Sequence, residues 1–174
     1  LRTPGMMGSR FALTDVKASG LHLNYENNGW KVGFDGDQEE HNADISDPTN
    51  PMFWTKNYND VERDRYSLFG EWSGQLNSDW TLESGIRLSH IKSDAGTVGS
   101  SMAMMPNPMG AAVTTLSDRF NNSDRSQDDN IIDLMALFTY KINNDLDIEL
   151  GLARKERAPS YQERYLWMPM ESTS

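Results

Sequence analysis

The chain has 174 residues, of which 37% are hydrophobic and 24% charged, and it contains no cysteine. The absence of cysteine excludes disulfide bonds and thiolate metal sites. The net charge of −10 argues against sequence-independent nucleic-acid binding, which needs a stripe of Lys and Arg to neutralise phosphates. No run approaches the roughly 18 apolar residues of a transmembrane helix. A membrane β-strand stays open, because its signal is alternation rather than a run.

Apolar and polar residues alternate with a period of two along much of the chain, which is the repeat of a β-strand. No segment carries a sustained apolar stripe at helical spacing. The alternation predicts six strands, at about residues 11–25, 30–35, 66–76, 80–89, 131–140 and 146–153. We therefore expect an all-β fold, an antiparallel up-and-down meander of about six strands.

Three tight turns pair these strands: Asn27-Asn28-Gly29, Asn77-Ser78-Asp79 and Asn143-Asn144-Asp145. Asn, Asp and Gly tolerate the positive φ angles of short hairpins. The other connections, residues 42–62 and 93–129, are long and rich in polar residues, Pro and Met, so we expect functional loops there. Short and long connections then alternate, with every short one at the same end. This asymmetry is typical of an outer-membrane barrel, with short periplasmic turns and long extracellular loops.

Four aromatic residues on the apolar parity lie within three residues of a tight turn: Tyr25, Trp30, Trp80 and Tyr140. Amphipathic aromatic side chains that lie at the same height are favoured at a membrane interface. We also expect one continuous exposed apolar face, formed by Leu82, Ile86, Leu88, Ile148, Leu150 and Leu152. A soluble β-sandwich alternates in the same way, with that face buried in its core. The loop asymmetry and the aromatic level favour the barrel.

Six strands raise a problem of closure. Single-chain bacterial barrels start at about eight strands. A six-stranded meander in lipid would leave two unpaired edges, and lipid cannot satisfy their backbone groups. The sequence therefore predicts a fragment of a large transmembrane β-barrel.

Residues 151–165 contain the spacing Arg-x-Pro-x-x-x-Glu, in Arg157, Pro159 and Glu163. This segment resembles the stretch that follows a late barrel strand in TonB-dependent outer-membrane receptors. Barrel strands of these receptors also resemble residues 30–43, and residues 69–72 followed by 82–87. The copper-receptor subgroup resembles residues 161–167. The resemblance implies a barrel of about 22 strands that is plugged by a separate N-terminal domain. Residues 1–174 would be a partial barrel domain without that plug.

The resemblance implies transport rather than catalysis. The chain would be part of a receptor in the bacterial outer membrane that takes up a metal ion or metal chelate, of copper or siderophore type, by TonB-driven import. Its expected partners are outer-membrane lipid, TonB through the missing plug, and the metal or chelate. No cofactor, catalytic residue or nucleic acid is expected. The alternative is a secreted β-sandwich whose long loops bind carbohydrate or protein.

One segment is unusually rich in methionine, with four of the chain's ten inside eight residues: Met102, Met104, Met105 and Met109. Thioethers are soft ligands that select Cu(I). His41 could join such a site if the loops fold inward. The alternative is packing, because methionine fills irregular contacts and no His or Cys is adjacent.

Acidic residues cluster at two places, Asp35, Asp37 and Glu39, and Asp124, Asp128 and Asp129. Hard cations such as Ca²⁺ take oxygen clusters of this kind. Neither segment has EF-hand spacing, so we expect solvated charge instead. Four further charged residues should face the barrel lumen: Glu83, Arg87, Asp147 and Glu149.

Overall fold

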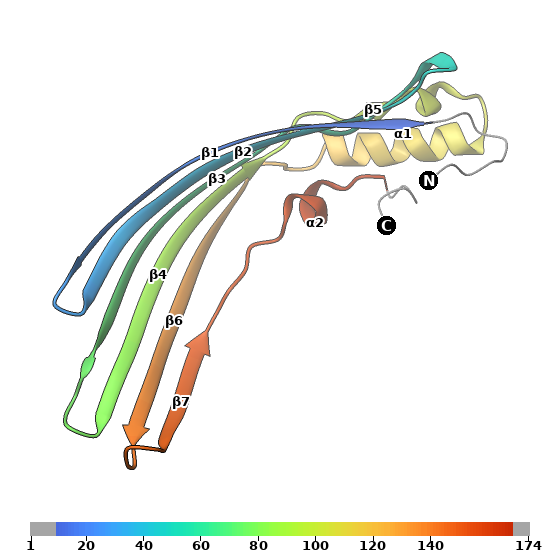
Figure 1. Cartoon of the computed structure of the whole chain (residues 1–174). Helices are drawn as coiled ribbons and strands as arrows, with labels where there is room; N and C mark the ends of the chain where they lie inside the picture. Colours follow the sequence, from blue (N-terminus) through green and yellow to red (C-terminus); the bar gives the residue numbers. More distant parts are fainter. Residues whose placement is uncertain (1–9, 169–174) are drawn as a thin grey trace.

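The computed structural model describes residues 10–168, which form one curved antiparallel sheet with helices at one end (Figure 1). The strands are β1 (Phe11–Asn27), β2 (Trp30–Asp47), β3 (Asn50–Gln75), β4 (Trp80–Asp94), β5 (Gly99–Ser100), β6 (Gln127–Lys141) and β7 (Asp147–Arg154). The helices are η1 (Ser101–Met104), α1 (Pro108–Asn121) and α2 (Tyr161–Tyr165). The strand order is β1-β2-β3-β4-β6-β7, and the short β5 pairs with β3. The predicted meander is confirmed.

The three predicted tight turns all lie at one end of the sheet (Figure 1). Between β1 and β2, Asn28 has φ +50° and Gly29 has φ +79°, as a two-residue type I′ turn requires. In the next turn the Asn77 side chain accepts hydrogen bonds from the backbone N–H groups of Asp79 (2.9 Å) and Trp80 (3.0 Å). The third turn repeats this use of asparagine, since Asn143 accepts from the N–H of Asp145 (2.9 Å).

The register places the apolar parity on the convex face of the sheet. One row across five strands is Leu23, Phe34, Leu68, Leu88 and Ile132. The predicted face is present, because Ile86, Leu88, Ile148, Leu150 and Leu152 are exposed and Leu82 is half-buried. All strands within residues 10–168 belong to the one sheet, so these residues do not form the alternative β-sandwich.

The prediction of a long loop at residues 42–62 is wrong. β2 continues to Asp47, the chain turns at Pro48 and Thr49, and β3 begins at Asn50. Asp47 closes this turn by accepting hydrogen bonds from the N–H (2.8 Å) and hydroxyl (2.6 Å) of Thr49. Both faces of this part of β2 carry polar residues, so it lacks the alternation that reveals a strand. The strict alternation of short turns and long loops therefore does not hold.

Residues 93–129 are also more ordered than a loop, because they contain β5, η1 and α1. Asn107 caps α1 by accepting from the N–H of Gly110 (2.9 Å), and Pro108 occupies its first turn. The buried residues of this helix are Gly110, Val113 and Ser117. They have helical spacing, but two of the three are not apolar, so this helix leaves no apolar stripe in the sequence. No helix within residues 10–168 is long and apolar enough to span a membrane.

Hydrophobic clusters lie where the helices meet the concave face of the sheet, at the end away from the tight turns (Figure 1). The upper cluster contains Ile45, Phe53, Val98, Met102, Val113, Trp167 and Met168. The lower cluster contains Tyr58, Val61, Ala95 and Tyr165. The C-terminal segment therefore packs against strands that come much earlier in the chain.

The first turn gives a test of the hairpin geometry. A Cβ at Gly29 would lie 2.2 Å from the backbone oxygen of Ser73, at a φ that L residues disfavour. We expect Gly29→Ala to lower the unfolding free energy by at least about 1–2 kcal/mol, from the left-handed backbone alone. Urea unfolding followed by tryptophan fluorescence measures this. The control is Gly151→Ala, whose Cβ would lie 3.6 Å from Leu137 Cδ1, an ordinary van der Waals contact. Equal losses in both variants would contradict the prediction.

Candidate functional site

The segment after β7 leaves the sheet and crosses its concave face to reach β2 and β3 (Figure 1). The indole N–H of Trp167 donates a hydrogen bond to the Lys56 carbonyl (3.0 Å). The Tyr161 ring stacks on His41, with ring centroids 4.2 Å apart, and meets Tyr58 edge-on at 5.4 Å. This segment therefore links the last strand of the sheet to its second and third strands on the concave side.

Arg157 and Glu163, the charged residues of the Arg-x-Pro-x-x-x-Glu pattern, build a clamp with Ser160 at the start of α2. The Arg157 guanidinium donates two hydrogen bonds to the Glu163 carboxylate (2.6 and 3.0 Å). Glu163 also accepts from the Ser160 N–H (2.7 Å), and its own N–H donates to the Ser160 hydroxyl (3.3 Å). Together these bonds lower the pKa of Glu163 from 4.5 to about 2, and the bonds from Arg157 contribute most. Sequence reasoning missed Ser160, although Ser-x-x-Glu is the signature of a capping box.

The last residues of α2 attach this segment to the sheet. Arg164 forms an ion pair with Asp129 of β6, and both side chains are largely buried. The Tyr165 hydroxyl donates to the Arg125 carbonyl (2.9 Å), and burial raises the pKa of this tyrosine. The last two residues of α2 thus contact Asp129 of β6 and the Arg125 carbonyl just before that strand.

Three acidic residues of β2 and β6, Asp35, Asp37 and Asp129, are paired with arginines rather than solvated. Asp35 contacts both Arg87 and His22. Asp37 accepts from Arg65 at 2.6 Å. Within residues 10–168 no three His, Asp or Glu side chains converge as they would around a metal ion. These carboxylates therefore bind arginines of β3, β4 and α2, and the expectation of solvated charge is corrected at Asp35, Asp37 and Asp129.

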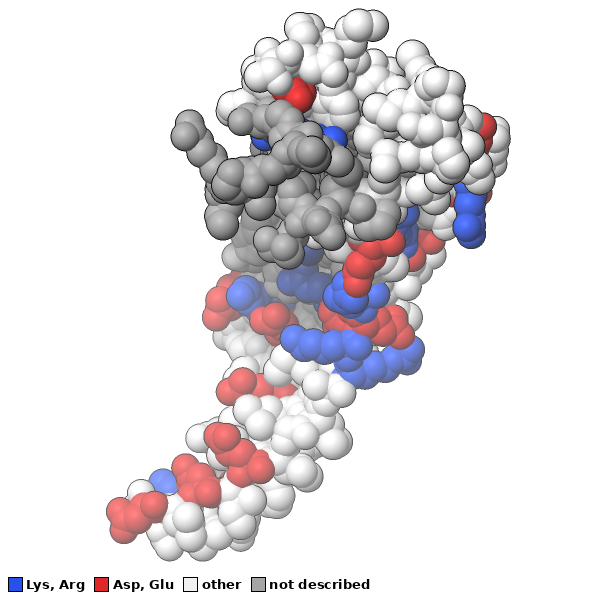
Figure 2. Space-filling model, turned by 90° about the vertical axis from the view of Figure 1, so that its right-hand side faces the viewer, with Lys and Arg blue, Asp and Glu red and all other residues white. Residues whose placement is uncertain are grey.

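The charge on the concave face changes along the strands (Figure 2). Basic and acidic side chains mix across its middle, whereas acidic ones predominate towards the tight turns. The register places Glu83, Asp147 and Glu149 on this face as expected, because each lies on the parity opposite to the apolar one. Lys31 lies 4.0 Å from Glu71 at the same end. The lower concave face is therefore predominantly negative.

The methionine segment divides between the core and the surface. Met102 is buried in the upper cluster, beside Val98 and Val113. Met104, Met105 and Met109 are 78%, 41% and 55% exposed. Met102 therefore packs in the core, as the packing alternative for this segment expects.

His41 lies on the concave face of β2. Its contacts are with Tyr161 and Glu39 rather than with the exposed methionines. Its ring stacks on Tyr161, and its Nε2 lies 3.4 Å from the Glu39 carboxylate. Its Nδ1 is buried without a hydrogen-bond partner among the described residues. The segment that covers His41 is therefore the C-terminal one, and its role as a ligand stays a prediction.

The four predicted interface aromatics lie near the tight turns. Trp80 and Tyr140 face each other across β4 and β6, with ring centroids 4.8 Å apart. Trp30 pairs with Trp72 at 6.4 Å, and Tyr25 is exposed beside them on β1. Sequence reasoning missed Trp72, because it lies five residues before its turn, although its parity is the apolar one. The membrane-interface role of these rings stays a prediction.

The clamp predicts a specific titration. The pKa of Glu163 lies below its ordinary value, so its stabilisation of the α2 segment is complete above pH 4.5 and is lost as the pH falls through about 2. The side-chain carboxyl resonance of Glu163, followed by NMR, should therefore titrate near pH 2. In Arg157→Gln the midpoint should rise towards 4.5, because the hydrogen bonds that lower the pKa of Glu163 most are lost.

A matched control is Arg154→Gln, which removes the arginine that binds Glu156 and not Glu163. It should leave the Glu163 midpoint unchanged. A wild-type midpoint near 4.5 would show that the clamp does not form in solution.

The comparisons with known proteins agree with this architecture. A family model described as "TonB dependent receptor-like, beta-barrel" matches residues 6–171. Nothing among the curated proteins or the solved structures matches the chain. The family consists of bacterial outer-membrane proteins that serve TonB-driven import, and its β-barrel fits a curved antiparallel sheet with an apolar convex face. The chain therefore belongs to the β-barrel family of TonB-dependent receptors and is an outer-membrane protein.

Proposed function

We propose that the chain forms part of the wall and mouth of a receptor that takes up a metal ion or metal chelate. In this proposal the barrel portion covers residues 1–174, and the plug that contacts TonB lies outside them. The concave face is then the lumen wall, and the end with α1 and η1 is the extracellular mouth. The exposed methionines provide the first contact for a soft ion such as Cu(I).

The observation that carries the proposal is the exposure of three thioethers on one short segment. Methionine is usually buried, yet Met104 and Met109 are more than half exposed. Met102 is buried in the upper cluster and anchors the same segment to the sheet. The segment therefore presents its remaining sulfur atoms from a fixed base. Thioethers bind Cu(I) in preference to hard cations, and a transport site needs only weak capture.

The electrostatics of the lumen wall support a cationic cargo. Arginines on this wall already bind carboxylates, as in the pairs of Arg65 with Asp37 and Arg164 with Asp129. Towards the tight turns, Glu83, Asp147 and Glu149 form no ion pair with any described residue of the chain. A wall with free carboxylates attracts cations and repels anions. A metal ion, or a chelate without excess negative charge, fits it better than an anionic chelate.

We also propose roles for the aromatics near the tight turns. Tyr25, Trp30, Trp80 and Tyr140 lie on the lipid-facing side of the sheet at its turn end. Rings with one apolar and one polar part are favoured where hydrocarbon meets water. In this proposal they mark the periplasmic surface of the membrane.

The test compares two sets of methionine variants in the full receptor. Replacing Met104, Met105 and Met109 by Leu keeps size and apolarity but removes the sulfur lone pairs. We expect Cu(I) uptake into cells to fall severalfold, with the amount of folded receptor in the membrane unchanged.

The matched control is Met102→Leu, which changes the buried methionine of the same segment. It should leave uptake unchanged, because this sulfur packs in the core. Normal uptake in the triple variant would contradict capture by the exposed methionines. If the receptor still imported a different cargo in a TonB-dependent way, the metal proposal would fail while the transport function would stand.

A further inference from the structure

We propose that Trp167 positions the methionine segment (residues 102–109), so that docking of the C-terminal segment (residues 155–168) and capture of a soft ion strengthen each other. The soft ion is the cargo of the proposed function, and this part of the inference rests on that proposal. The contact between the two segments needs no metal. One contact then controls both the capture site at the mouth and the segment that crosses the concave face.

Both segments are held by two neighbouring residues of β3. The Thr55 hydroxyl is hydrogen-bonded to the Ser100 hydroxyl (2.7 Å) at a buried position just before the methionine segment. Ser100 in turn accepts a hydrogen bond from the Met102 N–H (3.2 Å) and so caps η1. The next residue of β3, Lys56, accepts the bond from the Trp167 indole through its carbonyl (3.0 Å). This part of β3 therefore joins two segments that are far apart in the chain.

The side chains of the two segments also pack in one hydrophobic cluster. Met102 comes from the methionine segment, and Trp167 and Met168 come from the C-terminal segment. All three are buried in the upper cluster, together with Val113 of α1. Protein interiors are close-packed, so the loss of a large side chain leaves a cavity and loosens its neighbours. Displacement of Trp167 would therefore open the cluster that seats Met102.

The exposed methionines depend on the seat of Met102, because short backbone contacts hold the segment together. The Met105 N–H donates to the Met102 carbonyl (3.2 Å) at the end of η1. The Thr114 hydroxyl donates to the Ala103 carbonyl (3.2 Å) and links α1 to this turn. A Cβ at Gly110 would overlap the Met105 carbonyl oxygen, so the glycine lets α1 lie directly against the segment. A change at the seat of Met102 therefore reaches the three exposed sulfur atoms together.

The other anchors of the C-terminal segment lie across the concave face and leave polar atoms unpaired (Figure 1). Tyr161 stacks on His41 of β2, and Arg164 binds Asp129 of β6. Nδ1 of His41 and Nη1 of Arg164 are nevertheless buried without a hydrogen-bond partner among residues 10–168. A buried polar atom without a partner costs free energy. The docked state is therefore less stable than its contacts alone would make it, and an ion that favours this state can shift the docking equilibrium.

Coupling between two binding events is reciprocal. A docked C-terminal segment fixes the three exposed thioethers before the ion arrives, and a site fixed in advance binds more tightly. A bound ion in turn stabilises the docked segment. Displacement of the segment therefore weakens capture and clears the concave face in the same step, as release of cargo into the lumen requires.

The first test needs no metal and measures hydrogen exchange of the full receptor in detergent by mass spectrometry. Trp167→Ala removes the contact itself, and Arg164→Gln removes the anchor on β6. We expect both variants to exchange severalfold faster than wild type in residues 161–167 and also in residues 102–109. Unchanged exchange of residues 102–109 in folded Trp167→Ala would overturn the inference.

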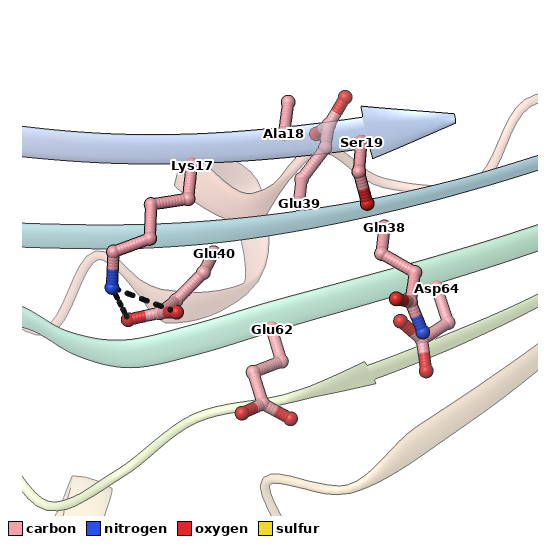
Figure 3. A pocket seen from close by; sticks show the side chains of 8 residues that line it. All are labelled: Lys17, Ala18, Ser19, Gln38, Glu39, Glu40, Glu62 and Asp64. Carbon is pink, nitrogen blue, oxygen red and sulfur yellow. Dashed lines mark hydrogen bonds and ion pairs between the residues drawn. The ribbon is translucent and has the colours of Figure 1, made fainter.

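Two control variants remove an ion pair of the sheet outside the contact. Arg65→Gln breaks the pair with Asp37 on the concave face. Lys17→Gln breaks the pair with Glu40 on the convex face, which is shown in Figure 3. Both should leave the exchange of the two segments at the wild-type rate. Heat-dependent electrophoretic mobility checks the folding of every variant.

The second test titrates Cu(I) into the same receptors in competition with a chromogenic Cu(I) chelator. We expect Trp167→Ala and Arg164→Gln to bind Cu(I) about fivefold more weakly or worse, although neither position carries a thioether. Cu(I) should slow the exchange of residues 161–167 in wild type, but not when the three exposed methionines are replaced by leucine. Equal Cu(I) affinity in wild type and folded Trp167→Ala would overturn the coupling. Absence of Cu(I) binding by wild type would contradict the proposed function, whereas faster exchange in the metal-free variants would still support the contact.

Discussion

The structure depends on an unbroken backbone hydrogen-bond ladder across the part of the sheet that faces lipid. Hydrocarbon offers no partner to an N–H or C=O group, so every backbone group there must bond to a neighbouring strand. The register from β1 to β7 meets this requirement in the apolar region, where partners follow without a shift. The shifts between β2 and β3 lie between His41 and Asp47, beyond the apolar rows, where water can satisfy the displaced groups. Within residues 10–168, β1 and β7 each pair on one side only, so further strands of a barrel must supply their other partners.

The same constraint explains which elements could be predicted from sequence. In β4 and β7 one face meets lipid and the other the lumen, and this contrast produces the alternation of Leu82, Ile86 and Leu88 with polar residues. Beyond the lipid, the convex face of β2 carries polar residues such as Glu40 and Asn42. Its concave face meets the hydrophobic clusters through Ala43 and Ile45, and this apolar parity is too short to reveal the strand. Helix α1 was missed for a related reason, since it packs through Gly110 and Ser117 as well as Val113. Small residues allow close packing, but they leave no apolar stripe in the sequence.

The candidate site was only partly visible in the sequence, because it is assembled from distant segments. Arg157 and Glu163 were singled out by a pattern, and their local clamp follows from the spacing. The long-range contacts that follow the clamp could not be predicted from the local sequence. The clamp directs Arg164 to Asp129, 35 residues earlier, and it precedes Trp167, which bonds to Lys56, 111 residues earlier. The binding partners of the C-terminal segment therefore lie in other strands. They come close to it only because the sheet is curved.

Within the methionine segment, one side chain packs in the core and three are exposed to solvent. Met102 and Met104 are two residues apart and chemically identical, yet one is 7% and the other 78% exposed. Helix η1 makes the difference, because its turn directs Met102 to Val98 and Trp167 while Met104 lies at its end. Of the two interpretations left open by the sequence, packing applies to Met102, and metal contact stays a proposal for the exposed sulfur atoms. A buried thioether in a filled core has lost the space that a ligand requires, so the proposed soft-metal contact is confined to Met104, Met105 and Met109, which are exposed.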